Sequence, residues 1–194
     1  MFFEISDRIN ELSKIALQKS KPVFEGIDQL TEYNQQKVLS AFIRNRVDET
    51  DFNTTTGYGY SDKGREKLDN LVADIFGTES AIIRAGALAS GTHTLAVCLY
   101  GILRPNDVML CVTGTPYDTL HSTIGLGGKN MGDGTLADFG VHYQQVDLTE
   151  NDEIDYDAIE ECAKDKAVRM VYIQRSRGYS LRHTISIAEI EKVC

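Results

Sequence analysis

The segment at residues 90–112, SGTHTLAVCLYGILRPNDVMLCV, decides the fold class, because it joins a helix-forming stretch to a short apolar run. The stretch near 91–103 is long enough for a helix, and the run at 107–112 has the length and composition of a strand. The same alternation continues outward, with strands expected at 80–84, 141–146 and 169–174 and helices near 117–126 and 155–164. This pattern predicts an α/β fold, in which a mainly parallel sheet carries helices on both faces.

The composition is that of an ordinary globular protein. The chain has 194 residues, enough for one domain with its own core, and 42% of them are hydrophobic. The formal net charge of -9, from 20 basic and 29 acidic residues, argues against a nucleic-acid-binding protein, because phosphate neutralisation requires clustered Lys and Arg. The start of the chain, MFFEISDRINELSKIALQKS, carries charges throughout, so we expect no secretory signal, no membrane association and a cytoplasmic protein.

Several familiar site motifs do not occur. The four cysteines are widely spaced, with no histidine at metal-ligand spacing, so we expect buried free thiols and no metal site. The stretch Gly125 to Asn130 matches neither a dinucleotide fingerprint nor a P-loop, so neither NAD nor ATP is indicated. The four histidines are dispersed, and we assign none of them a catalytic role.

The N-terminal part of the chain is expected to be a helical arm. Two sets of apolar residues at helical spacing predict two helices within residues 4–47. The segment 51–61, DFNTTTGYGYS, is rich in Thr, Tyr and Gly and predicts an ordered loop. A third helix follows, and Gly77 is placed to end it in the left-handed conformation.

The end of the chain predicts one more helix. Ser186 and Glu189 have the spacing of a capping box, so a helix should begin at about residue 187. A parallel sheet normally continues into another strand after such a helix, and we therefore expect the chain to be a piece of a longer protein.

The most informative local feature is Ser90-Gly91-Thr92, which begins a helix after an expected strand. Free N–H groups and the helix dipole favour phosphate at such a point. Ser90 can cap the helix, Gly91 allows a ligand to approach the backbone, and Thr92 adds a hydroxyl. The tripeptide therefore predicts an anion site, although an ordinary helix N-cap remains the alternative.

Other side chains are expected near the same sheet edge. Tyr117 follows the strand at 107–112 and could stack on a flat heterocycle or simply pack at a helix start. Arg175 and Arg177 follow the strand at 169–174, where they could bind a carboxylate or phosphate or be solvated. Tyr58 and Tyr60 lie in the loop before the third helix, where they could reach a ligand or another subunit.

Taken together, the motifs resemble the Cys/Met-metabolism family of pyridoxal-phosphate enzymes, which have the large-domain architecture called fold type I. The branch that they resemble most is the methionine gamma-lyase-like proteins called aluminium resistance proteins. The resemblance extends from about Gln35 to Cys194, and its specificity comes from the order and spacing of five motifs: QQKVLSAFIRNRV, TTGYGYSDKGREKL, SGTHTLAVCLYGILRPND, VTGTPYDTL and VYIQRSRGYS.

The resemblance implies pyridoxal 5'-phosphate as the cofactor and assigns residues to it. Ser90, Gly91 and Thr92 match the segment that holds the cofactor phosphate, and Tyr117 matches the aromatic residue that stacks on the pyridine ring. Tyr58 matches the tyrosine of a Tyr-x-Arg element supplied by a neighbouring subunit, although Tyr60 stands in place of the arginine. The family's Glu-Ser-Pro-x-Asn-Pro turn is replaced here by the segment 174–179.

The resemblance places the catalytic lysine and the partner of the pyridine nitrogen after Cys194, so no catalytic residue is assigned within the chain. It also implies a homo-oligomer, either a dimer or a homotetramer, with a shared active site. Residues 1–60 would form a helical arm with a subunit-contact loop, and residues 61–194 would form the first part of the cofactor domain.

The function implied is a carbon–sulfur lyase that acts on a sulfur-containing amino acid of the cystathionine, cysteine or methionine type, by elimination through a quinonoid carbanion. Two alternatives stay open: a non-catalytic module that binds a phosphorylated metabolite, and a pyridoxal-phosphate enzyme of another reaction type, such as an aldolase.

Overall fold

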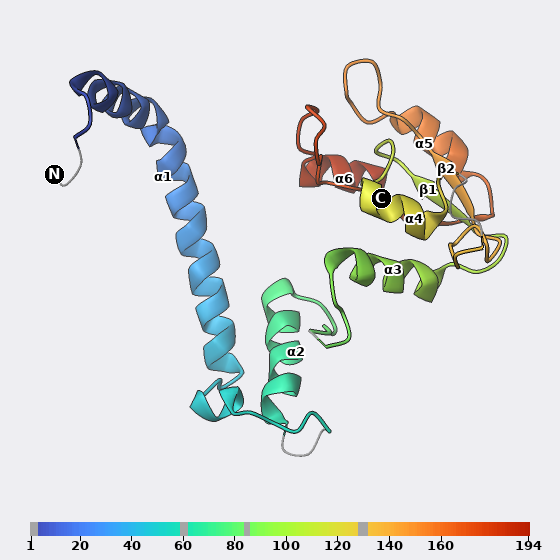
Figure 1. The fold of residues 1–194 in the computed structure, drawn as a ribbon, viewed down its shortest axis with the longest axis horizontal. Coiled ribbons are helices and arrows are strands. Elements are labelled where there is room, and N and C mark those ends of the chain that lie inside the picture. Colours follow the sequence, from blue (N-terminus) through green and yellow to red (C-terminus); the bar gives the residue numbers. More distant parts are fainter. Residues whose placement is uncertain (1–3, 59–61, 84–85, 128–131) are drawn as a thin grey trace. The chain divides into compact units, whose positions relative to one another are not determined.

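A computed structural model describes residues 4–58, 62–83, 86–127 and 132–194 of the chain (Figure 1). The chain divides into two compact units, Met1–Arg84 and Ala85–Cys194, and each is described by itself. The predicted division at residue 60 concerns the role of each part in the whole protein, and it stays a prediction.

The first unit begins with a single long helix, α1 (Asp7–Arg44, 38 residues), so the prediction of two helices is wrong. Pro22 lies inside α1, and Figure 1 shows that the helix bends in its darker blue N-terminal half. Proline removes one backbone hydrogen bond and typically costs about 3 kcal/mol inside a helix. Its fixed φ is nevertheless helical, and good helix-forming residues on both sides keep the helix continuous.

A short connection leads from α1 to the second long helix of this unit. The 3₁₀ helix η1 (Glu49–Phe52) begins with a capping box formed by Asp48 and Asp51, and α2 (Lys63–Phe76) follows. Gly77 ends α2 with a φ of 65°, as predicted. Arg44 donates two hydrogen bonds to the Asp74 carboxylate, at 3.0 and 2.9 Å, and thereby joins the end of α1 to α2.

The strand expected at 80–84 does not form in its described residues, 80–83, which are irregular. The Ile83 amide instead donates to the Asp69 carboxylate of α2, at 2.9 Å. A strand requires a neighbouring strand edge for its backbone groups. An apolar run alone cannot show whether such an edge is available, which explains why this prediction is wrong.

The second unit is built around a three-stranded parallel sheet, in the order β2-β1-β3. The strands are β1 (Val108–Cys111), β2 (His142–Gln145) and β3 (Val168–Tyr172), which confirms the three other predicted strands. The helices are α3 (Gly91–Ile102), α4 (Asp118–Ile124), α5 (Tyr156–Ala163) and α6 (Ile187–Val193), all close to their predicted ranges.

The strand order places helices on both faces of the sheet. The connection from β1 to β2 runs in one direction and the connection from β2 to β3 runs back past β1, so right-handed crossovers put α4 and α5 on opposite faces. Side chains of β1 accordingly alternate between two apolar clusters. Met109 packs with residues of α3 and α4, whereas Leu110 packs with residues of the α5 and α6 side.

The remaining sequence expectations concern the cysteines, the last helix and membranes. The prediction of buried thiols is confirmed for Cys111, whereas Cys162 is half-buried. It is wrong for Cys98 in α3 and for Cys194, the C-cap of α6, which are exposed. The capping box of α6 is present as predicted. Within the described ranges, no helix combines the length and the apolar character needed to cross a membrane.

Candidate functional site

The candidate site lies at the carboxyl ends of the three parallel strands, where ligands bind in open α/β sheets. The helix α4 begins at this edge, because it follows β1 directly. The N-terminus of α3 reaches the same region, since the Thr92 hydroxyl lies 3.0 Å from the Thr119 hydroxyl in the first turn of α4. The structure therefore brings two helix N-termini together, a contact to which no sequence motif pointed.

The start of α3 carries unpaired backbone donors. Ser90 is extended (φ -160°, ψ 167°) and its Oγ accepts the His93 amide at 3.1 Å, as an N-cap does. In the described parts of the chain, the Gly91 and Thr92 amides have no hydrogen-bond acceptor. A Cβ at Gly91 would meet no atom within 4 Å, so the space beside these amides is open. Such a helix start can accept an anion.

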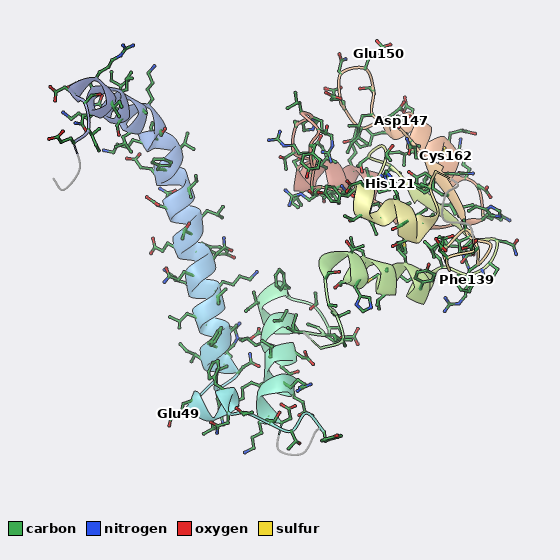
Figure 2. The ribbon with its side chains drawn as sticks, in the orientation of Figure 1. Glu49, His121, Phe139, Asp147, Glu150 and Cys162 are labelled. Carbon is green, nitrogen blue, oxygen red and sulfur yellow. The ribbon has the colours of Figure 1, made fainter. Side chains whose placement is uncertain are left out.

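Tyr117 is fixed by contacts from the segment that follows β3. Its amide donates to Gln174 Oε1 at 2.8 Å, and its ring stacks on the Tyr179 ring with the centroids 6.4 Å apart and an interplanar angle of 26°. The hydroxyl of Tyr179 raises the pKa of Tyr117 above its ordinary value. On α4, His121 (Figure 2) has its Nε2 2.8 Å from the Pro116 carbonyl oxygen, which holds the turn before Tyr117.

Gly178 allows the segment after β3 to approach the Tyr117 ring. Its φ is 54°, in the left-handed region, and a Cβ there would lie 2.9 Å from Tyr117 Cε2. Any other residue at 178 would therefore be strained and would displace the ring. Together with Gln174, this glycine sets the position of Tyr117, and sequence reasoning did not find either role.

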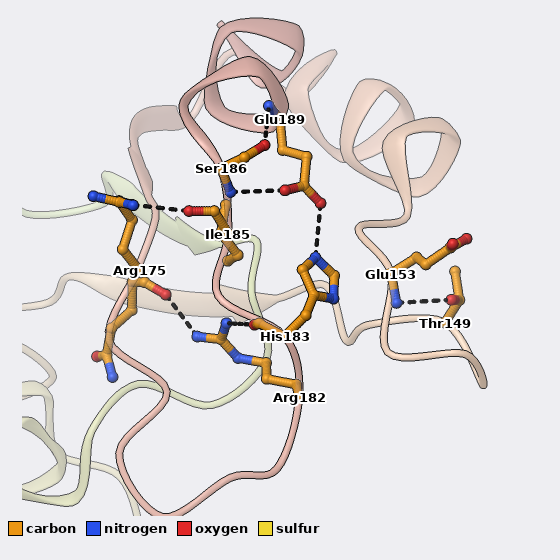
Figure 3. Close-up of polar contacts among 9 residues, drawn as sticks. Thr149, Glu153, Arg175, Arg182, His183, Ile185, Ser186 and Glu189 are labelled. Carbon is orange, nitrogen blue, oxygen red and sulfur yellow. Dashed lines mark hydrogen bonds and ion pairs between the residues drawn. The ribbon is translucent and has the colours of Figure 1, made fainter. Parts of the chain in front are cut away.

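The two arginines predicted at this edge, Arg175 and Arg177, donate to different backbone oxygens, and only Arg177 lines a pocket. Arg175 Nε donates to the Ile185 carbonyl oxygen at 2.9 Å, and Arg177 Nη1 donates to the Arg182 carbonyl oxygen at 2.9 Å. The buried guanidinium belongs instead to Arg182, which is 7% exposed. It donates to the His183 carbonyl oxygen (Figure 3), and also to the backbone oxygens of Gln174 and Ser176. Only the fold identifies Arg182, because its sequence neighbours form no recognisable motif.

A pocket of about 330 Å³ opens between these segments. All three strand ends contribute to it, and its lining residues are Thr113, Gly114, Thr115, Leu148, Asp152, Gln174, Ser176, Arg177, Ser180 and Arg182. Arg177 therefore lines the pocket, whereas Arg175 does not.

Tyr58 belongs to the other compact unit, where its side chain is 84% exposed. Its predicted role depends on a neighbouring subunit and stays a prediction. Tyr60 lies outside the described residues. Within the described ranges, no group of three or more His, Cys, Asp or Glu side chains is arranged to hold a metal ion.

Comparisons with known proteins point to one family. A family model described as methionine gamma-lyase matches residues 9–194. The uncharacterized protein YnbB of Bacillus subtilis (strain 168) is 41% identical over 172 residues, which cover 88% of this chain and 40% of that protein.

Solved structures give the same result. A carbon-sulfur lyase involved in aluminum resistance from Clostridium novyi NT has a TM-score of 0.89 and 40% identity, over 97% of this chain and 44% of its own. A proposed cystathionine beta-lyase involved in aluminum resistance from Clostridium acetobutylicum has a TM-score of 0.88 and 43% identity, again over 97% and 44%. The chain thus spans about two fifths of the length of these relatives.

Proposed function

The chain belongs to the methionine gamma-lyase family, and from this premise we propose that the whole protein is a pyridoxal 5'-phosphate-dependent carbon–sulfur lyase acting on a sulfur-containing amino acid. The names of the solved relatives support carbon–sulfur cleavage at the level of the family. The parallel sheet of this chain, with helices on both faces, and its similarity to those structures support the large-domain architecture of fold type I. The groups that react with the substrate belong to the part of the protein beyond this chain.

The observation that carries the proposal is the open N-terminus of α3. The unpaired amides of Gly91 and Thr92, with the hydroxyls of Ser90 and Thr92, suit a phosphate, and the absence of a Cβ at Gly91 leaves room for it. The residues present therefore fit the cofactor. When bound, pyridoxal 5'-phosphate supplies an electron sink for a carbanion at the substrate α-carbon.

The residues of this chain bind and orient in the proposed mechanism. Ser90, Gly91 and Thr92 would hold the phosphate, and the Tyr117 ring would stack on the pyridine ring and exclude water from that face. Because Gln174 holds the Tyr117 amide and Gly178 contacts its ring, Tyr117 is already positioned before a ligand arrives. Preorganisation of this kind reduces the entropy lost on binding.

We propose that the protein is a homo-oligomer, a dimer or tetramer in which Tyr58 completes the phosphate site of a neighbouring subunit. Exposed apolar side chains along α1 support this proposal, because apolar surface of this kind is typical of protein–protein interfaces. Six of these side chains are each more than half exposed: Ile9, Leu12, Ile27, Leu30, Leu39 and Ile43.

We also propose a cytoplasmic location, which the acidic composition and the four free thiols support.

The second candidate is a module that binds a phosphorylated metabolite without catalysis. It is favoured by the same open start of α3, which requires no lysine. An aldolase or another pyridoxal-phosphate reaction would use the site in the same way. These functions share phosphate binding and differ in the chemistry after it, so a single experiment separates them.

The test is to add pyridoxal 5'-phosphate to the full-length protein, record its visible absorption, and measure sulfhydryl release from cystathionine. We expect absorption that borohydride abolishes, and thiol release that depends on the cofactor. Ser90→Ala should weaken cofactor binding, whereas Ser186→Ala, which removes a serine cap from α6, should leave it unchanged. A colourless protein would refute the cofactor, and a coloured protein that releases no thiol from any sulfur amino acid would refute the lyase.

A further inference from the structure

The pocket at the carboxyl ends of the strands is lined by both positively and negatively charged side chains, and the proposed cofactor site uses none of these side chains. Arg177 and Arg182 reach it from the segment after β3, and Asp152 reaches it from the segment after β2. Its volume of about 330 Å³ is at the lower end of the roughly 300–1,000 Å³ typical of small-molecule pockets. The pocket is therefore suited to a small, charged molecule.

Arg182 gives the pocket a permanent positive charge. Its guanidinium is buried, and its recorded partners are three backbone oxygens, at 3.0, 2.8 and 3.2 Å. These oxygens satisfy its donors without neutralising its charge, because a guanidinium stays protonated in proteins. In the described part of the chain, no carboxylate forms an ion pair with it. A ligand that brings negative charge is favoured beside such a group.

Arg177 is the side chain that can contact such a ligand. It is exposed, lines the pocket, and uses one of its nitrogens to donate to the Arg182 carbonyl oxygen. A guanidinium has five N–H donors in a planar fork, so Arg177 keeps donors for a bidentate contact with a carboxylate.

Asp152 contributes the opposite charge from a different segment. It has a φ of 60°, and a hydrogen bond from its amide to the Thr149 carbonyl oxygen, at 2.9 Å, closes the turn that presents it. Its side chain forms no ion pair with a described residue. An ammonium group is the natural partner of a free carboxylate at this place.

We propose that this pocket binds the zwitterion of a small amino acid, with its carboxylate at Arg177, under the influence of Arg182, and its ammonium at Asp152. This inference rests on the proposed function in one respect: it makes the pocket the place where the amino-acid substrate of the lyase is first recognised. Neither group alone would select an amino acid, since a carboxylic acid satisfies only the arginines and an amine satisfies only the aspartate.

The first experiment is equilibrium dialysis of the purified full-length protein, without cofactor and at constant ionic strength, against isotopically labelled L-alanine. L-Alanine has no leaving group, so binding is measured without turnover. Alaninamide lacks the carboxylate and propionate lacks the ammonium, and we expect each to compete about 10-fold more weakly, the effect of losing one charge-assisted hydrogen bond. The inference would be overturned if alaninamide or propionate competed as well as unlabelled L-alanine does, or if L-alanine did not bind.

The second experiment compares variants. Arg177→Gln and Asp152→Asn should each weaken L-alanine binding about 10-fold. Asn tolerates the left-handed conformation of residue 152, so this variant should fold normally. Arg175→Gln is the matched control, because Arg175 lies two residues away and also donates to one backbone oxygen, yet does not line the pocket. Unchanged binding by the first two variants, or equal loss with Arg175→Gln, would overturn the assignment.

These results are separable from the fate of the proposed function. Cofactor binding is read from the absorption spectrum, and amino-acid binding from dialysis of the cofactor-free protein. A normal cofactor spectrum without L-alanine binding would refute this inference alone. L-Alanine binding in a protein that takes up no cofactor would refute the proposed function alone.

Discussion

The helices α3 and α6 both begin at a serine cap, but only the N-terminus of α6 carries a negatively charged side chain in its first turn. Ser90 Oγ accepts the His93 amide at 3.1 Å, and Ser186 Oγ accepts the Glu189 amide at 3.2 Å. In α6, Glu189 also accepts the Ser186 amide at 2.7 Å, so a carboxylate sits at the positive end of the helix. In α3, the first turn contains no acidic residue.

This difference indicates that the charge of the third helical residue, more than the serine, decides how strongly the helix start attracts an anion. A glutamate at this position satisfies a backbone donor and neutralises the helix dipole within the chain itself. A histidine at the same position accepts the Ala89 amide through its Nδ1, at 3.2 Å, but brings no negative charge, so the positive end of the dipole stays available to an external anion. Variants that exchange or remove the features distinguishing the two helix starts should therefore separate helix stability from ligand binding.

The largest effect is expected from His93→Glu, which gives α3 the capping box of α6. The new carboxylate would repel the cofactor phosphate, and we expect the Kd for pyridoxal 5'-phosphate to rise about 100-fold, or about 2.7 kcal/mol. An absorbance titration measures it. His93→Gln is the control, since it can form the same hydrogen bond without charge. Equal losses in both variants would show that charge is not the cause.

The next effect is expected from the two serine caps. Ser90→Ala and Ser186→Ala should each lower the free energy of unfolding by about 1 kcal/mol, because each removes an acceptor for a helix amide. Urea denaturation measures the loss. Only Ser90→Ala should also weaken cofactor binding, so the two variants separate stability from ligand affinity. Equal weakening of cofactor binding by Ser186→Ala would contradict the comparison.

A smaller effect is expected at the first helical residue, which is Gly91 in α3 and Ile187 in α6. Gly91→Ala should raise the free energy of unfolding by about 0.5–1 kcal/mol, because the new Cβ meets no atom and the unfolded chain loses freedom. The same Cβ would stand beside the amides proposed to hold phosphate, so cofactor affinity should fall. Thermal unfolding with and without cofactor measures both. An alanine variant that binds cofactor as well as the native protein would remove Gly91 from the proposed site.

The smallest effect is expected from the titration of Glu189, since this carboxylate is partly exposed to solvent. Hydrogen bonds from the Ser186 amide and hydroxyl, followed by the contact with His183, lower the pKa of Glu189 to about 2 from 4.5. A pKa lowered by folding means that the carboxylate stabilises the fold above pH 4.5 and that this contribution is lost as the pH falls toward about 2.

The melting temperatures of the native protein and of Glu189→Gln should therefore differ most above pH 4.5 and converge toward pH 2. A difference between the native protein and Glu189→Gln that is constant across this range would contradict the role of the carboxylate.

Some features could be predicted because they depend on a few neighbouring residues. The capping box of α6, the left-handed Gly77 and the serine cap of α3 each involve residues within three or four positions of one another. Short-range hydrogen bonds and allowed backbone angles decide such features, so the sequence pattern suffices to identify them.

Other predictions were wrong because they depended on distant contacts. The run at 80–84 has the composition of a strand, but its described residues, 80–83, are irregular and form no strand. Two helices were expected within residues 4–47, yet a single helix continues through Pro22. Arg175 and Arg177 were both expected at the ligand-binding edge, but the fold turns Arg175 away and buries Arg182 in its place.

By itself, the sequence determined the alternation of strands and helices, the parallel sheet and the helix start at Ser90. It did so because apolar periodicity and capping are properties of short segments. Only the tertiary structure decided that the start of α3 is joined to that of α4 through Thr92 and Thr119, that Gln174 and Gly178 hold Tyr117, and that Asp152 and Arg177 share a pocket. These residues come together because at least one strand separates the members of each set along the chain, while the parallel sheet brings the strand ends to one edge. Packing of the whole unit stabilises that arrangement.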